Sequence, residues 1–332
     1  MTFDTLRLDK GLYTSEKGFT KSLEEIDPSE NYKGTELEGL DAYERQLKRF
    51  DIKVKGGHSD PVSKFFQTSD SAVLFPEYIK RSVEAAINTN NIIDDMVATT
   101  TIIDSLDYRS VYCQSIENDD SIDCINEGTF IPETEIKVKD SLTKLKKTGR
   151  TIVASYESIK SQRLDLFAVM LRQIGNYINS CQLLQAIEAI DTSDTPYVNA
   201  EVENKIGYND FVNLYTKLSP YNFDVVIAGP LTFVDIINIP EFKDAAAGLD
   251  FHGTGNLITP FGAKFLFSKV ELLDRKVFAL DKRFALEKVQ FGEVVTDFDK
   301  LIDRQIERAT VTATAGFNRI IDEACAVIDP KI

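Results

Sequence analysis

The chain of 332 residues is 43% hydrophobic and 27% charged, an ordinary composition for a globular protein that can bury a core in one elaborated domain or two. The formal net charge of −15 argues against direct binding to nucleic acid, because phosphate contacts need clustered lysine and arginine. The N-terminus lacks the apolar core of a signal peptide, and the most apolar window, 223–239, is too short and too interrupted to span a bilayer comfortably, so neither export nor a membrane is indicated.

The cysteine and histidine content argues against a metal centre. The cysteines are scattered without a CxxC pair, and only His58 and His252 could complete a metal site. We therefore expect no bound metal and the reduced cysteines of an intracellular protein. These cysteines are Cys113, Cys124, Cys181 and Cys325.

Residues 1–73 are expected to form an N-terminal extension and arm. The first 34 residues are polar, acidic and irregular in pattern, so we expect no core of their own there. Thr35 and Glu38 then have the spacing of a capping box, which predicts a helix that starts at this point. This helix serves either to bind a partner or to pack on its own domain. Its apolar stripe consists of Leu37, Leu40, Tyr43, Leu47 and Phe50.

An extended connection and a second helix are predicted next. Gly56, Gly57 and Pro61 indicate an arm or linker over 55–73. Pro76 is expected to open the following helix, because proline is well tolerated in a first turn. The inward face of this helix would consist of Ile79, Val83 and Ile87.

Residues 108–157 predict a long β-hairpin. Ser110–Ile116 is a candidate first strand, and the alternation of Ile136 and Val138 with charged residues indicates a second strand that continues to an apolar run at 152–154. At roughly 3.3 Å per residue, the arms would be about 30–40 Å long. An isolated two-stranded hairpin is only marginally stable in water, so this one needs a surface to lie on. We expect that surface to be another copy of the chain.

Residues 158–195 predict a long helix. Apolar residues recur at spacings of three and four from Leu164 to Ile187, Ser158 and Ser161 are candidate N-caps, and Pro196 lies beyond the end. If unbroken, this helix would be about 45 Å long at 1.5 Å per residue. A hairpin and a helix of these lengths, joined directly, are not expected in a compact monomer.

Past Pro196 the pattern changes to mixed helices and strands. We predict a helix capped by Asn209 or Asp210, a short buried strand at Asp224–Gly229 and a helix that starts at Pro230. A glycine-rich loop at 248–262 precedes strands near 263–272 and 276–281, two long strands over 283–314 and a closing segment at 318–328. This order is α+β, without the regular alternation of a doubly wound fold.

No motif predicts catalysis. The acidic run at 118–123 resembles a calcium loop, but Cys124 and Phe130 stand where that loop needs glycine and glutamate. The run HGTG at 252–255 lacks the third glycine of a phosphate-binding loop, since Ile258 stands there. Neither histidine lies near a nucleophile elbow, and nothing singles out a pair among 53 acidic residues. We therefore predict no catalytic, cofactor-binding or metal-binding residues.

With these elements in this order, the chain resembles the major capsid proteins of tailed bacteriophages with the Hong Kong 97-type fold. LFPEYIKRSVEAAI (74–87) resembles the segment that enters the body of that fold. EGTFIPETEIKVKDSLTKLKKTGRTIVASYESI (127–159) resembles the outgoing half of its extended loop, with Glu-Gly and Ile-Pro-Glu landmarks and paired lysines before an apolar strand. FNRIIDEACAVI, near the C-terminus, resembles the family's last strand.

The resemblance implies an α+β architecture with a peripheral and an axial domain. Its parts would be an N-terminal extension and arm (1–73), the segment leading into the peripheral domain (74–107), the extended-loop hairpin (108–157), the spine helix of the peripheral domain (158–195), the axial domain (196–283), the returning strands of the peripheral domain (284–316) and the C-terminal strand of the axial domain (317–332).

The resemblance also implies a structural protein rather than an enzyme. Its copies would form hexamers and pentamers and close into an icosahedral virion shell around double-stranded DNA, which is enclosed without sequence-specific binding. Assembly would take place in the host cytoplasm, with scaffolding, portal and head-decoration proteins as possible partners and with no cofactor or membrane. Because no asparagine lies between Asn256 and Asn318, we expect no covalent cross-link of the founding member's kind. We also expect no N-terminal cleavage, and a separate scaffolding protein or none.

Charge placement suggests which residues meet between copies. A basic cluster on the extended loop would dock on acidic residues of the returning strands of a neighbour, although exposed pairs are worth only about 0–1 kcal/mol each. On the loop the expected contact residues are Glu127, Gly128, Pro132, Glu133, Lys144, Lys146, Lys147 and Arg150. On the returning strands they are Glu287, Glu293, Asp297, Asp299 and Asp303.

Two other functions remain open from the sequence. An encapsulin-type nanocompartment would use the same fold to enclose an enzyme, although the long region 1–73 suits the larger lattice of a virus. A soluble enzyme with a carboxylate-based site is the alternative from another class.

Overall fold

The computed structural model describes residues 3–13, 18–89, 91–115, 127–128, 134–155, 157–158, 161–243, 258–259, 261–270, 275–301, 303 and 305–330. The chain divides into two compact units. The first unit comprises Met1–Asn90, Thr148–Ile178 and Val294–Ala313, and the second comprises Asn91–Lys147, Asn179–Glu293 and Thr314–Ile332. Each unit therefore combines segments that are far apart in the sequence.

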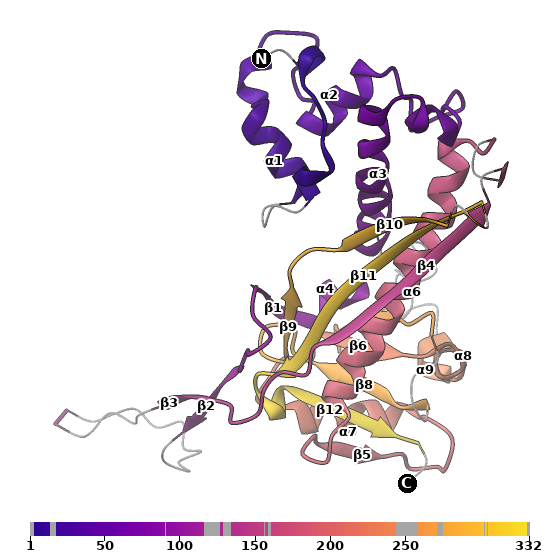
Figure 1. Ribbon diagram of the computed structural model, residues 1–332. Helices are drawn as coiled ribbons and strands as arrows, with labels where there is room; N and C mark the ends of the chain where they lie inside the picture. Colours follow the sequence, from indigo (N-terminus) through magenta and orange to yellow (C-terminus); the bar gives the residue numbers. More distant parts are fainter. Residues whose placement is uncertain are drawn as a thin grey trace. The chain divides into compact units, whose positions relative to one another are not determined.

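The N-terminal residues fold as part of the first unit. Short 3-10 helices at Phe3–Thr5, Lys10–Tyr13 and Ser29–Tyr32 flank α1 (Phe19–Ile26), and α2 (Ala42–Arg49) follows (Figure 1). Residues 1–34 were expected to be irregular, with no core of their own. They instead contain helices, and their few apolar side chains join a core that a later helix supplies. Leu6, Leu8, Phe19 and Leu23 are buried in one cluster with residues of α3 (Ser69–Asn88).

The helix expected at Thr35 begins seven residues later, as α2. The Asp41 side chain accepts a hydrogen bond from the Glu44 amide at 2.8 Å, and the Glu44 carboxylate accepts one from the Asp41 amide, which completes a capping box. The backbone at Gly39 has a φ of 84°, which lies outside the helical region. A helix that starts at Thr35 cannot pass through this position.

The next helix, α3, begins earlier than expected. Thr68 and Ser71 form its capping box, so Pro76 lies inside the helix instead of opening it. Residues 55–73 were expected to be extended, but they contain a 3-10 helix at Val62–Phe66 and the start of α3. The burial of side chains on α3 offsets the backbone hydrogen bond that proline cannot donate.

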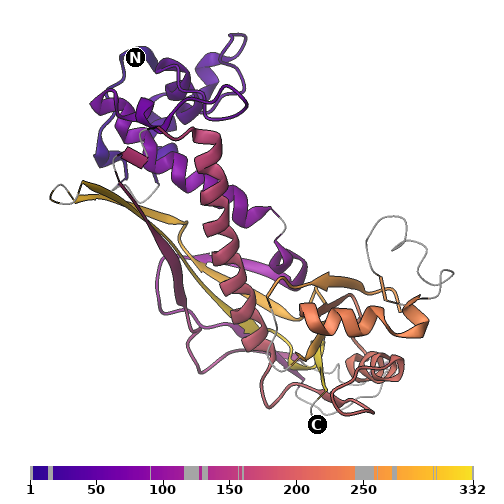
Figure 2. The same cartoon turned by 90° about the vertical axis from the view of Figure 1, so that its right-hand side faces the viewer.

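The long helix predicted within 158–195 is confirmed as α6 (Leu164–Ile190), which Figure 2 shows as one continuous helix. It begins after Ser158 and Ser161, so neither serine is its N-cap. In the first unit its apolar face packs in the same cluster as α3, and the rings of Phe75 and Phe167 stack with centroids 6.0 Å apart. None of the described helices is both long and apolar enough to cross a membrane.

A glycine on α6 permits close contact with α3. A Cβ atom added at Gly175 would lie 2.6 Å from the Ala86 Cβ and 2.7 Å from the Val83 carbonyl oxygen. Gly175→Ala is therefore expected to lower the free energy of unfolding by about 1–3 kcal/mol, measured by urea denaturation. Gln173→Ala, on the exposed side of the same helix, should change it by less than about 0.5 kcal/mol. Equal effects of the two changes would contradict this close packing.

Three strands complete the first unit. β10 (Val295–Leu301) pairs antiparallel with the beginning of β11 (Ile306–Arg319), and β4 (Lys146–Ser155) also pairs with β11. The sequence predicted two strands over 283–314, but the structure has three in this region, namely β9 (Leu286–Phe291), β10 and β11. The additional strand arises because β9 ends at a turn, where Gly292 has a φ of 61°.

The second unit contains a five-stranded sheet with helices on both faces. Its order is β5 (Tyr197–Asn199), β12 (Cys325–Asp329), β8 (Val277–Leu280), β6 (Val225–Ala228) and β7 (Lys264–Phe267). Alternate residues of β6, β8 and β12 pack against residues 183–190 of α6 on one face and against α7 (Tyr208–Leu218) on the other. The helices α8 (Pro230–Ile237) and α9 (Pro240–Lys243) follow β6, which confirms the predicted strand at 224–229 and the helices on either side. The predicted cap of α7 was wrong, because its N-cap is Gly207 and Asn209 and Asp210 lie in its first turn, where the Asp210 carboxylate accepts a hydrogen bond from the Gly207 amide.

A second five-stranded sheet, which includes β4, β9, β10 and β11, contains the last strand before the hairpin. After α4 (Ile92–Met96), β1 (Val97–Ile103) pairs parallel with β9, and β9 pairs antiparallel with the end of β11. β2 (Val111–Ser115) and β3 (Thr134–Val138) then form a separate two-stranded sheet.

The predicted outgoing strand of the hairpin is two elements. β3 belongs to the hairpin, but β4 pairs with β11, so the apolar run 152–154 lies outside the hairpin. Between them the chain returns to the body of the second unit, where the Thr143 amide donates to the Tyr108 carbonyl at 2.9 Å. Ile152 and Ala154 instead pack on the core of the first unit.

Candidate functional site

The β2–β3 hairpin presents an apolar face that no other described element covers. The register places Val111 opposite Val138, and Ile136 lies two residues further along on the same face. The exposed fraction is 46% for Val111, 57% for Val138 and 70% for Ile136. Among the described residues, the two strands pair only with each other, as Figure 1 shows.

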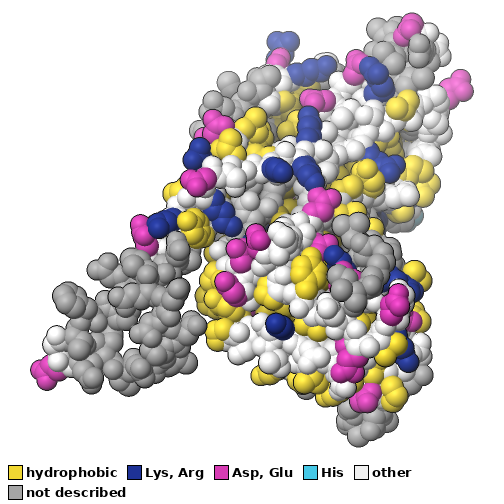
Figure 3. All heavy atoms as spheres, turned by 90° about the horizontal axis from the view of Figure 1, so that it is seen from below, with side chains coloured by type: hydrophobic (Ala, Val, Ile, Leu, Met, Phe, Trp, Pro, Cys, Tyr) yellow, Lys and Arg dark blue, Asp and Glu magenta, His cyan; other side chains and the backbone are white. Residues whose placement is uncertain are grey.

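The opposite face of the hairpin is polar. Lys137 and Glu135 form an exposed ion pair at 2.9 Å. Near the hairpin, Figure 3 shows basic, acidic and hydrophobic side chains close together, and charges of both signs are interspersed over the described residues of that view. This mixture differs from the continuous basic track that follows nucleic-acid phosphates.

The root of the hairpin is fixed to the second unit by hydrogen bonds. The Lys139 amide donates to the Ser110 carbonyl at 2.8 Å, which extends the pairing of β2 and β3 by one step. The Lys139 Nζ donates to the Arg319 carbonyl at 2.6 Å. These two hydrogen bonds therefore fix the root of the hairpin to the rest of the second unit.

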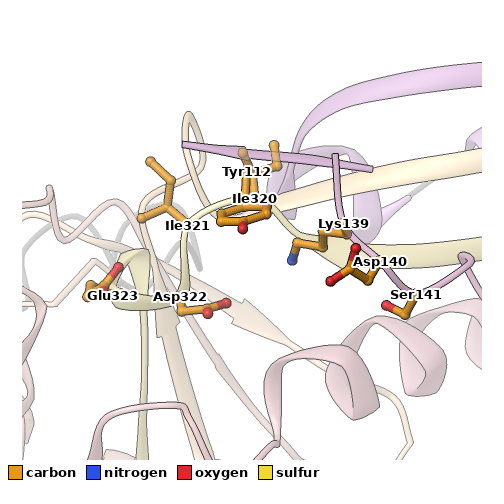
Figure 4. A pocket seen from close by; sticks show the side chains of 8 residues that line it. All are labelled: Tyr112, Lys139, Asp140, Ser141, Ile320, Ile321, Asp322 and Glu323. Carbon is orange, nitrogen blue, oxygen red and sulfur yellow. The ribbon is translucent and has the colours of Figure 1, made fainter. Parts of the chain in front are cut away.

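A hollow of about 520 Å³ lies beside this root (Figure 4). It is lined by Tyr112 and by residues 139–141 and 320–323. Its charged groups are one lysine and three carboxylates, and no group of three potential metal ligands occurs among the described residues. The hollow thus carries no cysteine or histidine that could serve as a nucleophile or base.

The expected basic cluster is exposed but already has contacts within its own units. In the second unit the Lys146 Nζ lies 2.5 Å from a Glu188 carboxylate oxygen of α6. In the first unit the Arg150 guanidinium lies 3.9 Å from the centre of the Tyr177 ring. Lys144 and Lys147 are exposed in the second unit.

The five acidic residues expected to contact a neighbour differ in their exposure to solvent. Glu293, Asp297, Asp299 and Asp303 are exposed, and Asp299 lies 2.5 Å from Arg308 on the paired strand β11. Glu287 differs, since only 5% of it is exposed and it accepts hydrogen bonds from hydroxyl groups of its own unit. Glu287 is therefore an internal residue rather than part of a surface that a neighbour could reach.

Two of the four remaining expected residues lie in the part of the chain that the structure describes. Glu127 and Gly128 form an exposed turn, in which Gly128 has a φ of 85° that favours glycine. Pro132 and Glu133 lie outside the described residues, as do the acidic run 118–123 and the glycine-containing run 252–255.

One pair of neighbouring carboxylates bears on the enzyme alternative. Burial, together with the nearby Asp281, raises the pKa of Asp224. Asp281 is fully buried and accepts hydrogen bonds from the amides of Asn222 and Arg283, each at 2.9 Å. The bond from Asn222 joins the segment before β6 to the end of β8, so the pair has a structural explanation.

The comparisons with known proteins agree on the fold. No family model and no curated protein matches the sequence. Among solved structures, a virus-like particle from Pyrococcus furiosus is 14% identical and matches 76% of this chain and 98% of its own, with a TM-score of 0.50. The capsid of the cyanophage P-SCSP1u is 11% identical over 72% of this chain and 88% of its own, with a TM-score of 0.50.

The capsid of a native GTA particle is 10% identical over 72% of this chain and 90% of its own, with a TM-score of 0.51. The long α6, the sheet of the second unit and the hairpin occur in the order that the resemblance implied. The chain has the Hong Kong 97-type fold of tailed-phage major capsid proteins.

Proposed function

We propose that this protein is a major capsid protein, the structural subunit of an icosahedral bacteriophage head. The observation that carries the proposal is the exposed apolar face of the β2–β3 hairpin. A two-stranded hairpin of this kind is marginal in water by itself, so it needs a partner surface. A repeating lattice offers each copy the same partner surface on a neighbour.

The proposed assembly consists of hexamers and pentamers that enclose double-stranded DNA. The net charge of −15 supports enclosure without sequence-specific binding, because an acidic protein repels packed phosphates. Scaffolding, portal and head-decoration proteins are proposed partners, and the virion, assembled in the host cytoplasm, is the proposed location. The role is structural, and we assign no catalytic residue.

An encapsulin-type shell is the second candidate. It is favoured by the match to the virus-like particle, since this chain covers 98% of that subunit. Both candidates require closed particles, but they differ in the contents of the particle.

The two candidates are distinguished by sedimentation and by nuclease protection. Purified protein is expected to sediment as large particles, and particles from infected or lysogenic cells should protect double-stranded DNA from nuclease. Particles that contain a single protein cargo and no protected DNA would favour the encapsulin-type shell. A subunit that stays monomeric at high concentration, with or without scaffold, would contradict both.

The N-terminal residues are proposed to stay attached in mature particles. Phe19 and Leu23 are almost fully buried in a cluster with residues of α3. Cleavage after α2 would therefore expose apolar surface on α3. Intact-mass measurement of particle protein should give a chain that retains residues 3–50. A chain that begins well after Phe50 would contradict this expectation.

The charge-based contact between copies also remains a proposal. Reversal of Lys144 and Lys147 to glutamate tests it without breaking the Lys146–Glu188 pair. We expect fewer particles at low salt, because like charges would face the acidic strands of a neighbour, and a smaller defect at high salt. The reversal Asp297→Lys in the same chain should partly restore assembly. Normal assembly of the lysine variant at low salt would exclude this contact.

A further inference from the structure

A buried carboxylate holds the first foot of the hairpin, which is the segment 108–110 that leads into β2. Glu287 on β9 is 5% exposed, and both of its carboxylate oxygens accept hydrogen bonds. Oε1 accepts from Thr101 Oγ1 at 2.7 Å and from the Tyr108 hydroxyl at 2.5 Å, while Oε2 accepts from Ser110 Oγ at 2.6 Å. Tyr108 and Ser110 belong to the segment that leads directly into β2.

The second foot of the hairpin, which is the segment 139–143 that follows β3, is attached next to the first. The Thr143 amide donates to the Tyr108 carbonyl at 2.9 Å, and Asn318 Nδ2 donates to Thr143 Oγ1 at 2.5 Å. Asn318 stands directly opposite Glu287 in the ladder of β11 and β9. Both feet are thus held at one rung of this ladder.

The chain beyond the second foot has little freedom. A Cβ atom at Gly316 would lie 2.8 Å from the Lys144 carbonyl oxygen, so the segment crosses β11 in close contact. Hydrogen bonds to an ionised acceptor are shorter and stronger than neutral ones and have a defined direction. A carboxylate with three donors therefore fixes the angle of the segment better than apolar packing alone.

We propose that Glu287 is a positioning residue that fixes the direction in which the β2–β3 hairpin leaves the second unit, and that this direction determines whether copies close into particles of one size. The second part rests on the proposed function. Burial, with the hydrogen bond to Glu287, raises the pKa of Tyr108, so its hydroxyl remains a donor at physiological pH. The three donors and the acceptor come from segments about 180 residues apart, and β1 and β9 bring them together.

The test removes donors and leaves the carboxylate in place. The double variant Tyr108→Phe, Ser110→Ala loses two of the three hydrogen bonds with little change in volume. Tyr112→Phe is the control, because Tyr112 lies on β2 beside the root hollow and is not among the groups that donate to Glu287. Glu287→Gln, which keeps the size but not the charge, is a second variant with an expected intermediate effect.

Hydrogen exchange on the dilute, unassembled subunit gives the first readout. The amides of Lys139 and Thr143 should exchange about tenfold faster in the double variant, while those of β6 and β8 stay unchanged. Equal exchange of Lys139 and Thr143 in the variant and the control would overturn the role of Glu287. This readout does not depend on assembly, so it separates failure of this inference from failure of the proposed function.

Electron microscopy of assembled particles gives the second readout. The double variant should form particles of mixed size or open sheets under conditions where the control forms uniform shells. Faster exchange combined with uniform shells would overturn the link between hairpin direction and closure. A general loss of stability would speed exchange in β6 and β8 as well, and that pattern would also contradict a positioning role.

Discussion

Replacing Ile136 and Val138 with aspartate is expected to abolish particle formation while the subunit remains folded. These side chains are 70% and 57% exposed, so the change costs little in the free subunit. In an assembled shell they would be covered by a neighbour, where two unpaired carboxylates would be strongly unfavourable. Because each copy would carry the defect at every contact, we expect complete loss of particles rather than a partial loss.

The chain itself supplies a matched control for this experiment. Glu135→Gln with Lys137→Gln changes the same strand on its polar face and removes an exposed ion pair worth about 0–1 kcal/mol. Light scattering should show particles for this control and only subunits for the aspartate variant, with equal circular dichroism spectra. Normal particles from the aspartate variant would show that the apolar face does not mediate assembly.

Arg45→Met is expected to destabilise the first unit by about 3–5 kcal/mol. The Arg45 side chain is fully buried, and its Nε lies 2.9 Å from an Asp27 carboxylate oxygen in a residue that is 2% exposed. Its guanidinium also donates to the Leu40 carbonyl at 2.7 Å and to Ser29 Oγ at 2.8 Å. Methionine fills the space but leaves a buried carboxylate without its cation.

Urea denaturation followed by circular dichroism measures this effect, since the chain has no tryptophan for fluorescence. Lys48→Met on the same helix is the control, because Lys48 is exposed and should change the free energy of unfolding by less than about 0.5 kcal/mol. Similar small effects for both changes would mean that residues 18–50 are not a cooperative part of the first unit.

The elements that the sequence predicted well are those with strong local signals. α6 has a long apolar periodicity, β6 is a short continuous apolar run, and α8 starts at Pro230 with the φ that proline prefers. For these segments the local pattern and the final burial agree, so neighbouring residues alone suffice for the prediction.

α1 and the short 3-10 helices within the first 34 residues were missed for a physical reason. Their few apolar side chains are buried only because α3 completes the cluster, and that helix begins at Ser69. Arg45 and Asp27 pair in the core of this region, and neither residue belongs to an apolar pattern that the sequence could show. Long-range packing of this kind leaves no periodic pattern in the first 34 residues.

The candidate site was predicted in part. The strands of the hairpin follow from the alternation of Ile136 and Val138, and their pairing with β2 is confirmed. The strand partner of β4 and the burial of Glu287 could not be predicted, because both depend on contacts with residues more than 100 positions away. A charged residue on a strand is exposed or buried according to which strands flank it, and local sequence does not specify those neighbours.

In the proposed shell, the hairpin of one copy lies on the next copy. Cryo-electron microscopy of purified particles tests it most directly. We expect an icosahedral shell of hexamers and pentamers in which the Val111, Ile136 and Val138 face contacts an adjacent subunit. Well-resolved particles in which this face is open to solvent, or a preparation that contains only monomers at high concentration, would contradict the account.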